Sequence, residues 1–174
     1  YSALSAELLQ DDKADQAIEC LKKAVKLNPN DATSYFNMGI MLQAEDNFKA
    51  AIESYQKSVS IQPDNAEAFN NMGVLQNRIG NPDAALTNYQ RAIQINPDYA
   101  NAYENKGNAL KDKGDQDASI KCYQQALLIR PSNADAYFNM GIAQRIKGDL
   151  DESITSFKRA LKINPEYAEV YYFM

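Results

Sequence analysis

The chain has 174 residues, of which 45% are hydrophobic and 24% are charged, so its length and composition suit a globular domain with a buried core. Its net charge of −5 and pI near 4.8, with no basic stripe, argue against a nucleic-acid-binding surface. No apolar run approaches the roughly 18 residues of a membrane span, so we expect a protein without a membrane segment, most simply a cytoplasmic one.

The first segment, residues 1–31, is a partial copy of a unit that repeats along the chain. It starts at Tyr1 rather than at methionine, so we expect a fragment or a processed form. It ends near Pro29, the first of five prolines that follow one another at intervals of 34 residues. The others are Pro63, Pro97, Pro131 and Pro165. A fixed period of this length is the signature of a repeat protein.

The next segment, residues 32–65, is the first complete copy, and its apolar spacing predicts two helices. Tyr35, Met38 and Leu42 recur at helical intervals, and Ile52, Tyr55 and Val59 do so again after a short polar stretch. Neither helix can bury its apolar stripe alone. We therefore expect antiparallel helix pairs that pack on each other and on the next pair.

The copies at residues 66–99, 100–133 and 134–167 repeat this pattern and add two series of glycines. One series lies just after each first helix, where a left-handed residue ends the helix. Its members are Gly80, Gly114 and Gly148. The other lies inside the first helices and predicts close approach to small residues of the second helix, because glycine there costs about 1 kcal/mol. Its members are Gly39, Gly73, Gly107 and Gly141.

The 34-residue period, the aromatic-x-x-Met/Lys-Gly opening and the closing proline resemble the tetratricopeptide repeat (TPR) family. Residues 168–174 then start a further copy. The resemblance implies an all-α fold, a right-handed α-α superhelix that forms a single TPR solenoid over residues 1–174. It also implies a scaffold that binds a protein or peptide partner.

An asparagine recurs just before the glycine of each first helix, although asparagine is a weak helix former. The resemblance implies that first helices line a concave groove, where such amides could bond an extended peptide, as in the similar asparagine ladder of O-linked N-acetylglucosamine transferases. The alternative is a structural role, a hydrogen bond to the neighbouring repeat. The predicted peptide-binding residues are Asn37, Asn71, Asn105 and Asn139 with Phe36, Ile40, Asn70, Val74, Glu104, Asn108, Phe138 and Ile142.

Catalytic chemistry finds no support in the sequence, so we expect no enzyme, no cofactor and no metal site within these residues. Histidine, the commonest general base and metal ligand, is absent. Cys20 and Cys122 lie three periods apart, too far for a disulfide in a solenoid, and are expected to be free thiols.

Two further functions remain open from the sequence. The chain could be the substrate-recruiting arm of a larger enzyme such as a glycosyltransferase. It could also assemble head to tail, because Tyr171, Tyr172, Phe173 and Met174 form an apolar segment without the polar cap that solenoids need for solubility.

Overall fold

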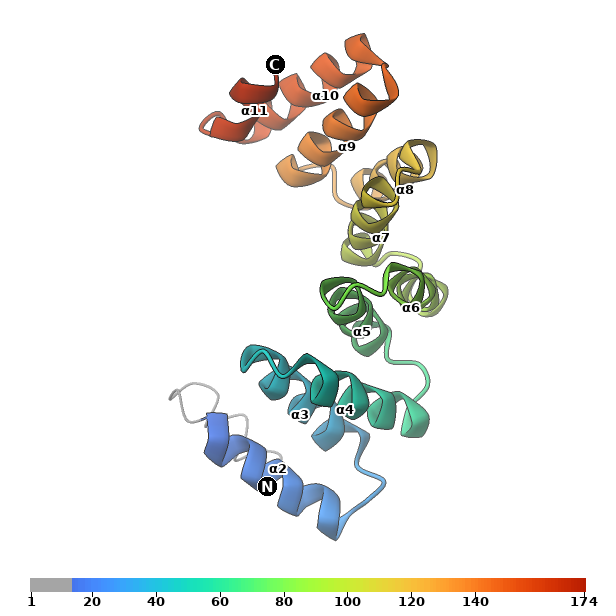
Figure 1. The fold of residues 1–174 in the computed structure, drawn as a ribbon, viewed down its shortest axis with the longest axis vertical. Coiled ribbons are helices and arrows are strands. Elements are labelled where there is room, and N and C mark those ends of the chain that lie inside the picture. The colour runs from blue at the N-terminus through green and yellow to red at the C-terminus, as the bar shows by residue number, and fades with distance from the viewer. Residues whose placement is uncertain (1–13) are drawn as a thin grey trace. The chain divides into compact units, whose positions relative to one another are not determined.

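A computed structural model describes residues 14–174, which form ten α-helices and no β-strand (Figure 1). The first thirteen residues of the predicted partial copy lie outside this range. The chain divides into two compact units, one ending at Ala84 and one running from Ala85 to Met174. The all-α fold of successive helix pairs is confirmed within each unit, while the single domain over residues 1–174 stays a prediction.

Unit 1 contains the second helix of the partial copy and the helices of the next one and a half repeats. They are α2 (Ala14–Leu27), α3 (Ala32–Ala44), α4 (Phe48–Ile61) and α5 (Ala66–Arg78). Each helix packs on the next along the chain: α2 on α3, α3 on α4, and α4 on α5. The first helices of two successive repeats, α3 and α5, thus both contact α4.

Unit 2 holds the remaining helices, and α6 starts three residues before the boundary. They are α6 (Pro82–Ile95), α7 (Ala100–Asp112), α8 (Gln116–Ile129), α9 (Ala134–Lys147), α10 (Leu150–Ile163) and α11 (Ala168–Phe173). Neighbours pack on one another from α7 to α11, and the first helices α7 and α9 also touch each other. This contact places the polar side chains of two repeats on one continuous surface.

The helices begin and end where the turn chemistry of the sequence predicts. The side chains of Asp31, Asn65 and Asn133 each accept a hydrogen bond from the backbone N–H three residues on, which caps α3, α5 and α9. Gly148 follows α9 with φ of 98°, in the left-handed region that glycine adopts without strain. The repeat of residues 32–65 places Asp46 there instead, with φ of 57°.

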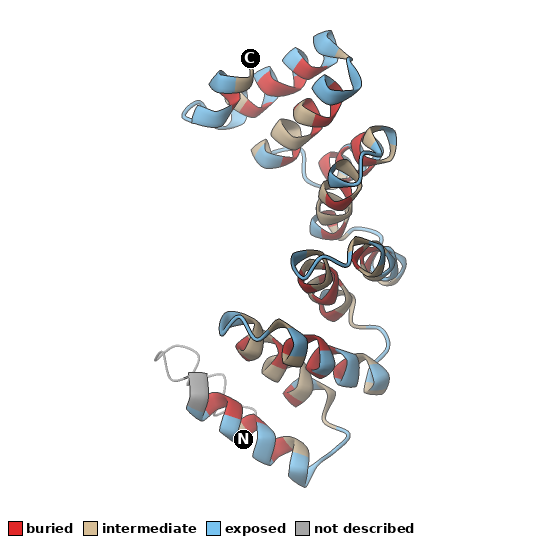
Figure 2. Cartoon of the chain, viewed as in Figure 1, coloured by how far each residue is buried: buried red, intermediate tan, exposed pale blue. Residues whose placement is uncertain are grey.

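The core of each unit contains buried aromatic rings of second helices, and these rings pack against the glycine of their own first helix. Tyr55, Tyr123 and Phe157 are at most 1% exposed and pack within the buried bands of Figure 2. A Cβ atom added to Gly39 would stand 2.6 Å from the Tyr55 ring, and one on Gly141 2.6 Å from Phe157. The glycines thus allow the predicted close approach, and the aromatic ring lies nearest to them. At Gly141 the predicted small residue Ser153 also approaches and donates its hydroxyl to the Gly141 carbonyl oxygen at 2.8 Å.

Candidate functional site

The predicted peptide-binding residues lie on two first helices of unit 1 and two of unit 2, and the term first-helix face denotes the surface that they form in each unit. Asn70 is buried, 5% exposed, and the other eleven are half-buried. They are Phe36, Asn37 and Ile40 on α3; Asn70, Asn71 and Val74 on α5; Glu104, Asn105 and Asn108 on α7; and Phe138, Asn139 and Ile142 on α9. Half-burial is what a groove residue needs, because part of the side chain is held by packing and part remains accessible.

In unit 1 the polar part of this face is a chain of neutral groups centred on Tyr55. The Tyr55 hydroxyl donates to Gln43 Oε1 at 3.1 Å and accepts from Asn71 Nδ2 at 3.5 Å. Asn70 Nδ2 in turn donates to Asn71 Oδ1 at 3.5 Å. Burial raises the pKa of Tyr55 to about 12, against which the Asn71 hydrogen bond acts weakly, so the phenol stays protonated at physiological pH.

The apolar residues of the face in unit 1 also contribute to the core. The Phe36 ring lies 5.6 Å from the Tyr55 ring, measured between centroids. Phe36 and Ile40 both pack against the buried cluster that contains Tyr55 and Met72. They therefore offer one edge to a partner rather than a whole side chain.

In unit 2 the same face is built from ionisable groups. Glu104 Oε2 accepts a hydrogen bond from Asn133 Nδ2 at 2.7 Å. Burial raises the pKa of the Glu104 carboxyl above its usual value, although the Asn133 bond and the nearby Arg130 charge oppose this. Arg130 itself donates to Asn101 at the start of the same repeat.

Two further bonds cross between neighbouring elements of unit 2. Lys111 Nζ donates to Asn139 Oδ1 at 3.1 Å, and burial lowers the pKa of this lysine. The Tyr123 hydroxyl donates to Asn108 Oδ1 at 2.6 Å, which repeats the tyrosine-to-first-helix bond of unit 1. Within unit 2 the Lys111–Asn139 bond thus joins polar groups of α7 and α9.

The C-terminal edge of the face is aromatic. Phe138 has the rings of Phe157, Tyr167 and Phe173 around it at centroid distances of 5.9, 5.1 and 5.6 Å. Tyr167 also donates to Asp135 Oδ1 at 2.6 Å, and Arg145 lies 4.8 Å above the Phe173 ring. Helix α11 therefore covers part of Phe138 and the neighbouring Ile142.

Members of the amide ladder form hydrogen bonds to the preceding repeat, as the alternative reading of the sequence anticipates. Asn71 contacts Tyr55 of the preceding repeat, and Asn139 contacts Lys111 of the preceding repeat. An amide carries two donors and two acceptor lone pairs, so one such bond leaves capacity for a ligand. Binding by the ladder stays a prediction.

Sequence reasoning missed the hydroxyls of the core tyrosines as organisers of the face. The aromatic position of the second helix holds Tyr55, Tyr89 and Tyr123, but Leu21 and Phe157 in the outer copies. The presence of a hydroxyl at three of these five positions was the sequence signal that could have indicated a polar role for the tyrosines. It also missed Tyr167 and Arg130, whose partners lie about one period away.

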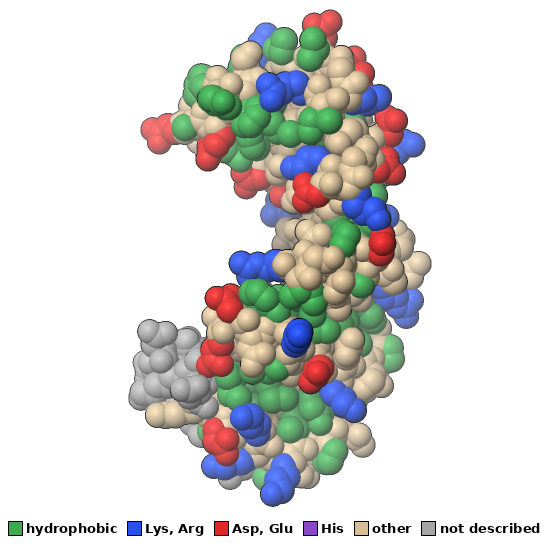
Figure 3. Space-filling view, viewed as in Figure 1, with side chains coloured by type: hydrophobic (Ala, Val, Ile, Leu, Met, Phe, Trp, Pro, Cys, Tyr) green, Lys and Arg blue, Asp and Glu red, His purple; other side chains and the backbone are tan. Residues whose placement is uncertain are grey.

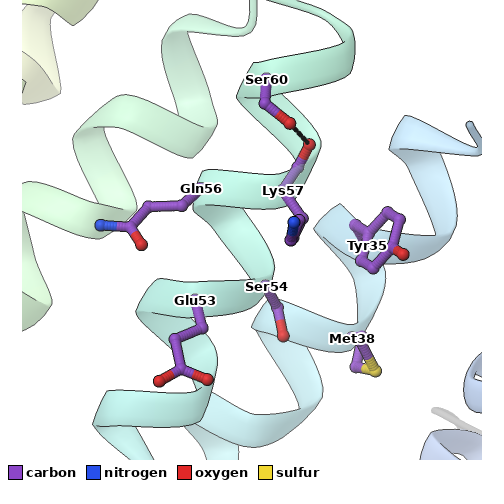
Figure 4. A pocket seen from close by; sticks show the side chains of 7 residues that line it. All are labelled: Tyr35, Met38, Glu53, Ser54, Gln56, Lys57 and Ser60. Carbon is purple, nitrogen blue, oxygen red and sulfur yellow. Dashed lines mark hydrogen bonds between the residues drawn. The ribbon is translucent and has the colours of Figure 1, made fainter.

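A second feature, absent from the sequence reasoning, is a hollow beside the second helix of a repeat. In residues 32–65 it has a volume of about 480 Å³ and is lined by Tyr35 and Met38 of α3 with the α4 side chains Glu53, Ser54, Gln56, Lys57 and Ser60. Figure 4 shows the α3 side chains on one side of the hollow and the α4 side chains on the other. We call it the second-helix hollow.

Charged side chains are interspersed on the face drawn in Figure 3 and do not gather into one stripe. Among residues 14–174 no cluster of three or more His, Cys, Asp or Glu side chains is arranged to hold a metal ion. Within the same range no helix combines the length and apolarity needed to cross a membrane. Both cysteines of the chain, Cys20 and Cys122, are free thiols.

Sequence comparison finds tetratricopeptide repeats along the chain. One family model, described as TPR repeat, matches residues 7–46 and 107–145. Three further models, each described as tetratricopeptide repeat, match residues 30–98, 88–121 and 134–167. No curated protein sequence matches significantly.

Solved structures match over nearly the whole chain. The crystal structure of MamA is 31% identical, with 95% of this chain and 96% of that chain covered and a TM-score of 0.89. YrrB, described as a TPR protein with an unusual peptide-binding site, is 22% identical, with 97% and 87% covered and a TM-score of 0.84. PilF of Pseudomonas aeruginosa is 19% identical, with 98% and 78% covered and a TM-score of 0.84. The likenesses to YrrB and PilF concern the fold alone.

Proposed function

The chain belongs to the tetratricopeptide repeat family of protein-interaction scaffolds, and from this premise we propose that its first-helix face binds an extended peptide segment of a partner protein. The observation that carries the proposal is the burial pattern of that face. Eleven of its twelve predicted residues are half-buried, so they are held in place by packing and still reach solvent. A preorganised surface of this kind limits the ordering cost of binding.

The amides would recognise the peptide backbone and the flanking side chains would select the sequence. An amide both donates to and accepts from a peptide bond, so a ladder of amides binds main chain without regard to side chains. Phe36, Ile40 and Val74 supply apolar edges in unit 1, and Glu104 supplies a carboxylate in unit 2. The segment that fits is internal, apolar and basic.

The similarity to YrrB agrees with peptide binding but does not carry it. YrrB is described as a TPR protein with an unusual peptide-binding site, and at 22% identity the likeness extends to the fold only. The proposal therefore rests on this chain's own first-helix face.

Peptides selected on the purified chain by phage display would test the proposal. Replacement of Asn71, Asn105 and Asn139 by alanine should weaken binding of the selected peptide by roughly 10- to 1,000-fold, because each lost hydrogen bond costs about 0.5–1.5 kcal/mol. Circular dichroism checks that the helices survive, which matters because Asn71 and Asn139 also bond within the protein.

A matched control changes three exposed polar residues on the second helix α8, Lys121, Gln124 and Gln125, to alanine. This triple variant should bind the peptide as the wild type does. Unchanged binding by the folded asparagine variant would assign the ladder a purely structural role.

Head-to-tail self-association is a second candidate, favoured by one repeat position. Ile52 and Ile120 are 6% and 9% exposed, whereas Ile154 at the same position of residues 134–167 is 39% exposed. Nearby, Tyr172 is 86% exposed. The end of another copy could cover this apolar surface through a heterologous contact that propagates.

Sedimentation of the chain over a range of concentrations tests self-association. The proposal expects association that increases with concentration and is lost in Ile154→Lys. A monomer at all concentrations would contradict it. No observation in residues 14–174 favours the third function, a recruiting arm of a larger enzyme, over the scaffold.

A further inference from the structure

The second-helix hollow of residues 134–167 is extended by an adjoining hollow. The first, of about 370 Å³, includes Tyr137, Met140 and Ser156 in its lining, and the second, of about 310 Å³, includes Pro131 and Ile163. Both are lined by Tyr137 and Arg159. The shared residues join the two into one groove along α10, long enough for several residues of a peptide.

The two ends of this groove carry opposite charge. Arg159 and Lys162 line one end, and Asp151 and Glu152 line the other. Among residues 14–174 neither Arg159 nor Lys162 forms an ion pair, whereas Lys147 nearby pairs with Asp149 at 2.9 Å. Acidic residues at the start of a helix and basic ones at its end also stabilise the helix dipole, so charge order alone does not indicate a ligand.

Comparison with the hollow of residues 32–65 shows which charged residues are particular to the later repeat. The earlier hollow shares the tyrosine, methionine and serine, and it has Lys57 where the later repeat has Arg159. The charged positions differ at both ends: Glu53 corresponds to Thr155 and Ser60 to Lys162, while Lys49 and Ala50 stand where the later repeat has Asp151 and Glu152. The earlier hollow holds the carboxylate of Glu53 beside one cation, Lys57, whereas the adjoining hollow of the later repeat has two cations and no carboxylate among its lining residues.

We infer that the groove along α10 is a second interaction surface, separate from the first-helix face, for an internal peptide segment with an acidic residue, an apolar centre and a basic residue. The side-chain carboxylate lies between Arg159 and Lys162, where a guanidinium can bind it through two hydrogen bonds. The apolar centre lies on Tyr137 and Met140, and the basic residue meets Asp151 and Glu152.

The helix rise fixes the spacing in the partner. Glu152 and Arg159 lie seven residues apart on α10, about 10 Å at 1.5 Å per residue. An extended peptide covers this in about three residues at 3.3 Å each. The acidic and basic residues of the partner are therefore separated by two apolar ones.

Fluorescence anisotropy with labelled, end-capped peptides that contain Glu-Leu-Leu-Lys or Lys-Leu-Leu-Glu tests the inference at low ionic strength. One of the two should bind saturably, since the chain direction in the groove selects between them. The double variant Thr155→Glu with Lys162→Ser gives the basic end of the groove the residue types that residues 32–65 carry at these two positions. It should weaken binding roughly 5- to 20-fold, as two exposed ion pairs allow.

The matched control, Lys121→Glu with Leu128→Ser, introduces the same two residue types at the equivalent positions of α8. It lowers the net charge by the same two units and changes residues that are already exposed. Binding should stay at the wild-type level.

Equal losses in the double variant and in its control would show that only general charge acts, and would overturn the inference. Binding that requires a free C-terminal carboxylate in place of the internal glutamate would also overturn it. So would a preference for an oligonucleotide of equal length, which would identify the cations as a phosphate site.

Discussion

Unit 1 and unit 2 are built from the same type of repeat, but they differ in net charge and in the chemistry of the first-helix face. Unit 1 contains 12 acidic and 7 basic residues, and unit 2 contains 11 of each, so the whole net charge of −5 resides in unit 1. Yet the first-helix face of unit 1 is bonded through neutral amides and a phenol, while that of unit 2 is bonded through Glu104 and Lys111. Net charge therefore gives no guide to the character of a binding face.

The comparison shows which parts of the repeat are constrained. Tyr55 and Tyr123 occupy the same position, are both fully buried and both donate to a first-helix side chain. The acceptor differs, Gln43 in one unit and Asn108 in the other. Packing in the core therefore fixes the position of the tyrosine hydroxyl, while the first-helix side chain that accepts its hydrogen bond differs between the units.

The largest expected effect tests whether both units depend equally on that aromatic position. Tyr55→Ala and Tyr123→Ala should each lower the free energy of unfolding by about 3–5 kcal/mol, because both rings are fully buried. Tyr89, 2% exposed, should behave alike. Urea denaturation measures the change, and a loss below about 1 kcal/mol at any of the three would contradict the assigned burial.

A smaller effect tests the contact between glycine and ring. Gly39→Ala and Gly141→Ala should each destabilise the chain by about 1–2 kcal/mol, since overpacking outweighs the gain of roughly 1 kcal/mol in helix propensity. Gly107→Ala, whose added Cβ would lie 2.9 Å from the ring instead of 2.6 Å, should cost less. Thermal melts of the three variants give the order, and a uniform increase in stability would refute the close contact.

The pH dependence of stability should have opposite sign at two carboxyls, one in each unit. The hydrogen bond from Ser34 holds the pKa of Asp31 below its usual value, so the native state favours the carboxylate. Asp31→Asn should therefore lower stability at neutral pH, and the difference should vanish as pH falls through the native pKa.

Burial instead raises the pKa of Glu104, so its ionisation at neutral pH opposes folding. Glu104→Gln keeps an acceptor for Asn133 and should raise stability at neutral pH. The gain should be absent below the pKa of the unfolded state and appear as pH rises through the native one. Urea denaturation at a series of pH values distinguishes the two variants, and slopes of equal sign would disprove the assignment.

The smallest effect concerns the turn that differs among repeats. Asp46 has φ of 57° where later repeats have glycine, and its side chain forms an exposed ion pair with Arg78 at 3.9 Å. Asp46→Gly should stabilise the chain by about 0.5–1 kcal/mol, because relief of left-handed strain exceeds the entropic cost of glycine. The reverse change, Gly114→Asp, should destabilise it. Calorimetry would reject this account if both changes acted in one direction.

The sequence predicts the fold closely because the same pattern of apolar residues, glycines and prolines recurs in each repeat. The prolines and the glycines after the first helices mark helix ends, and the structure ends its helices there, with Gly148 in the left-handed region. The close approach at Gly39 was also predicted, but the ring of Tyr55 as its nearest neighbour was not, because spacing along a helix does not tell which side chain fills the space.

The candidate site is less predictable for physical reasons. Helical spacing placed Asn71 and Asn139 on the first helices, but their bonds to Tyr55 and Lys111 depend on rotamers and on contacts between repeats. The second-helix hollow arises where the small side chains Ser54 and Ser156 leave space beside a half-buried tyrosine. No local pattern records such a space.

The most direct test of the central claim is nuclear magnetic resonance mapping of the isotopically labelled chain with a peptide selected by phage display. The account predicts shift changes at the side-chain amides of Asn71, Asn105 and Asn139 and at the backbone of α5, α7 and α9. Changes confined to the second helices, with those amide signals unmoved, would contradict binding at the first-helix face.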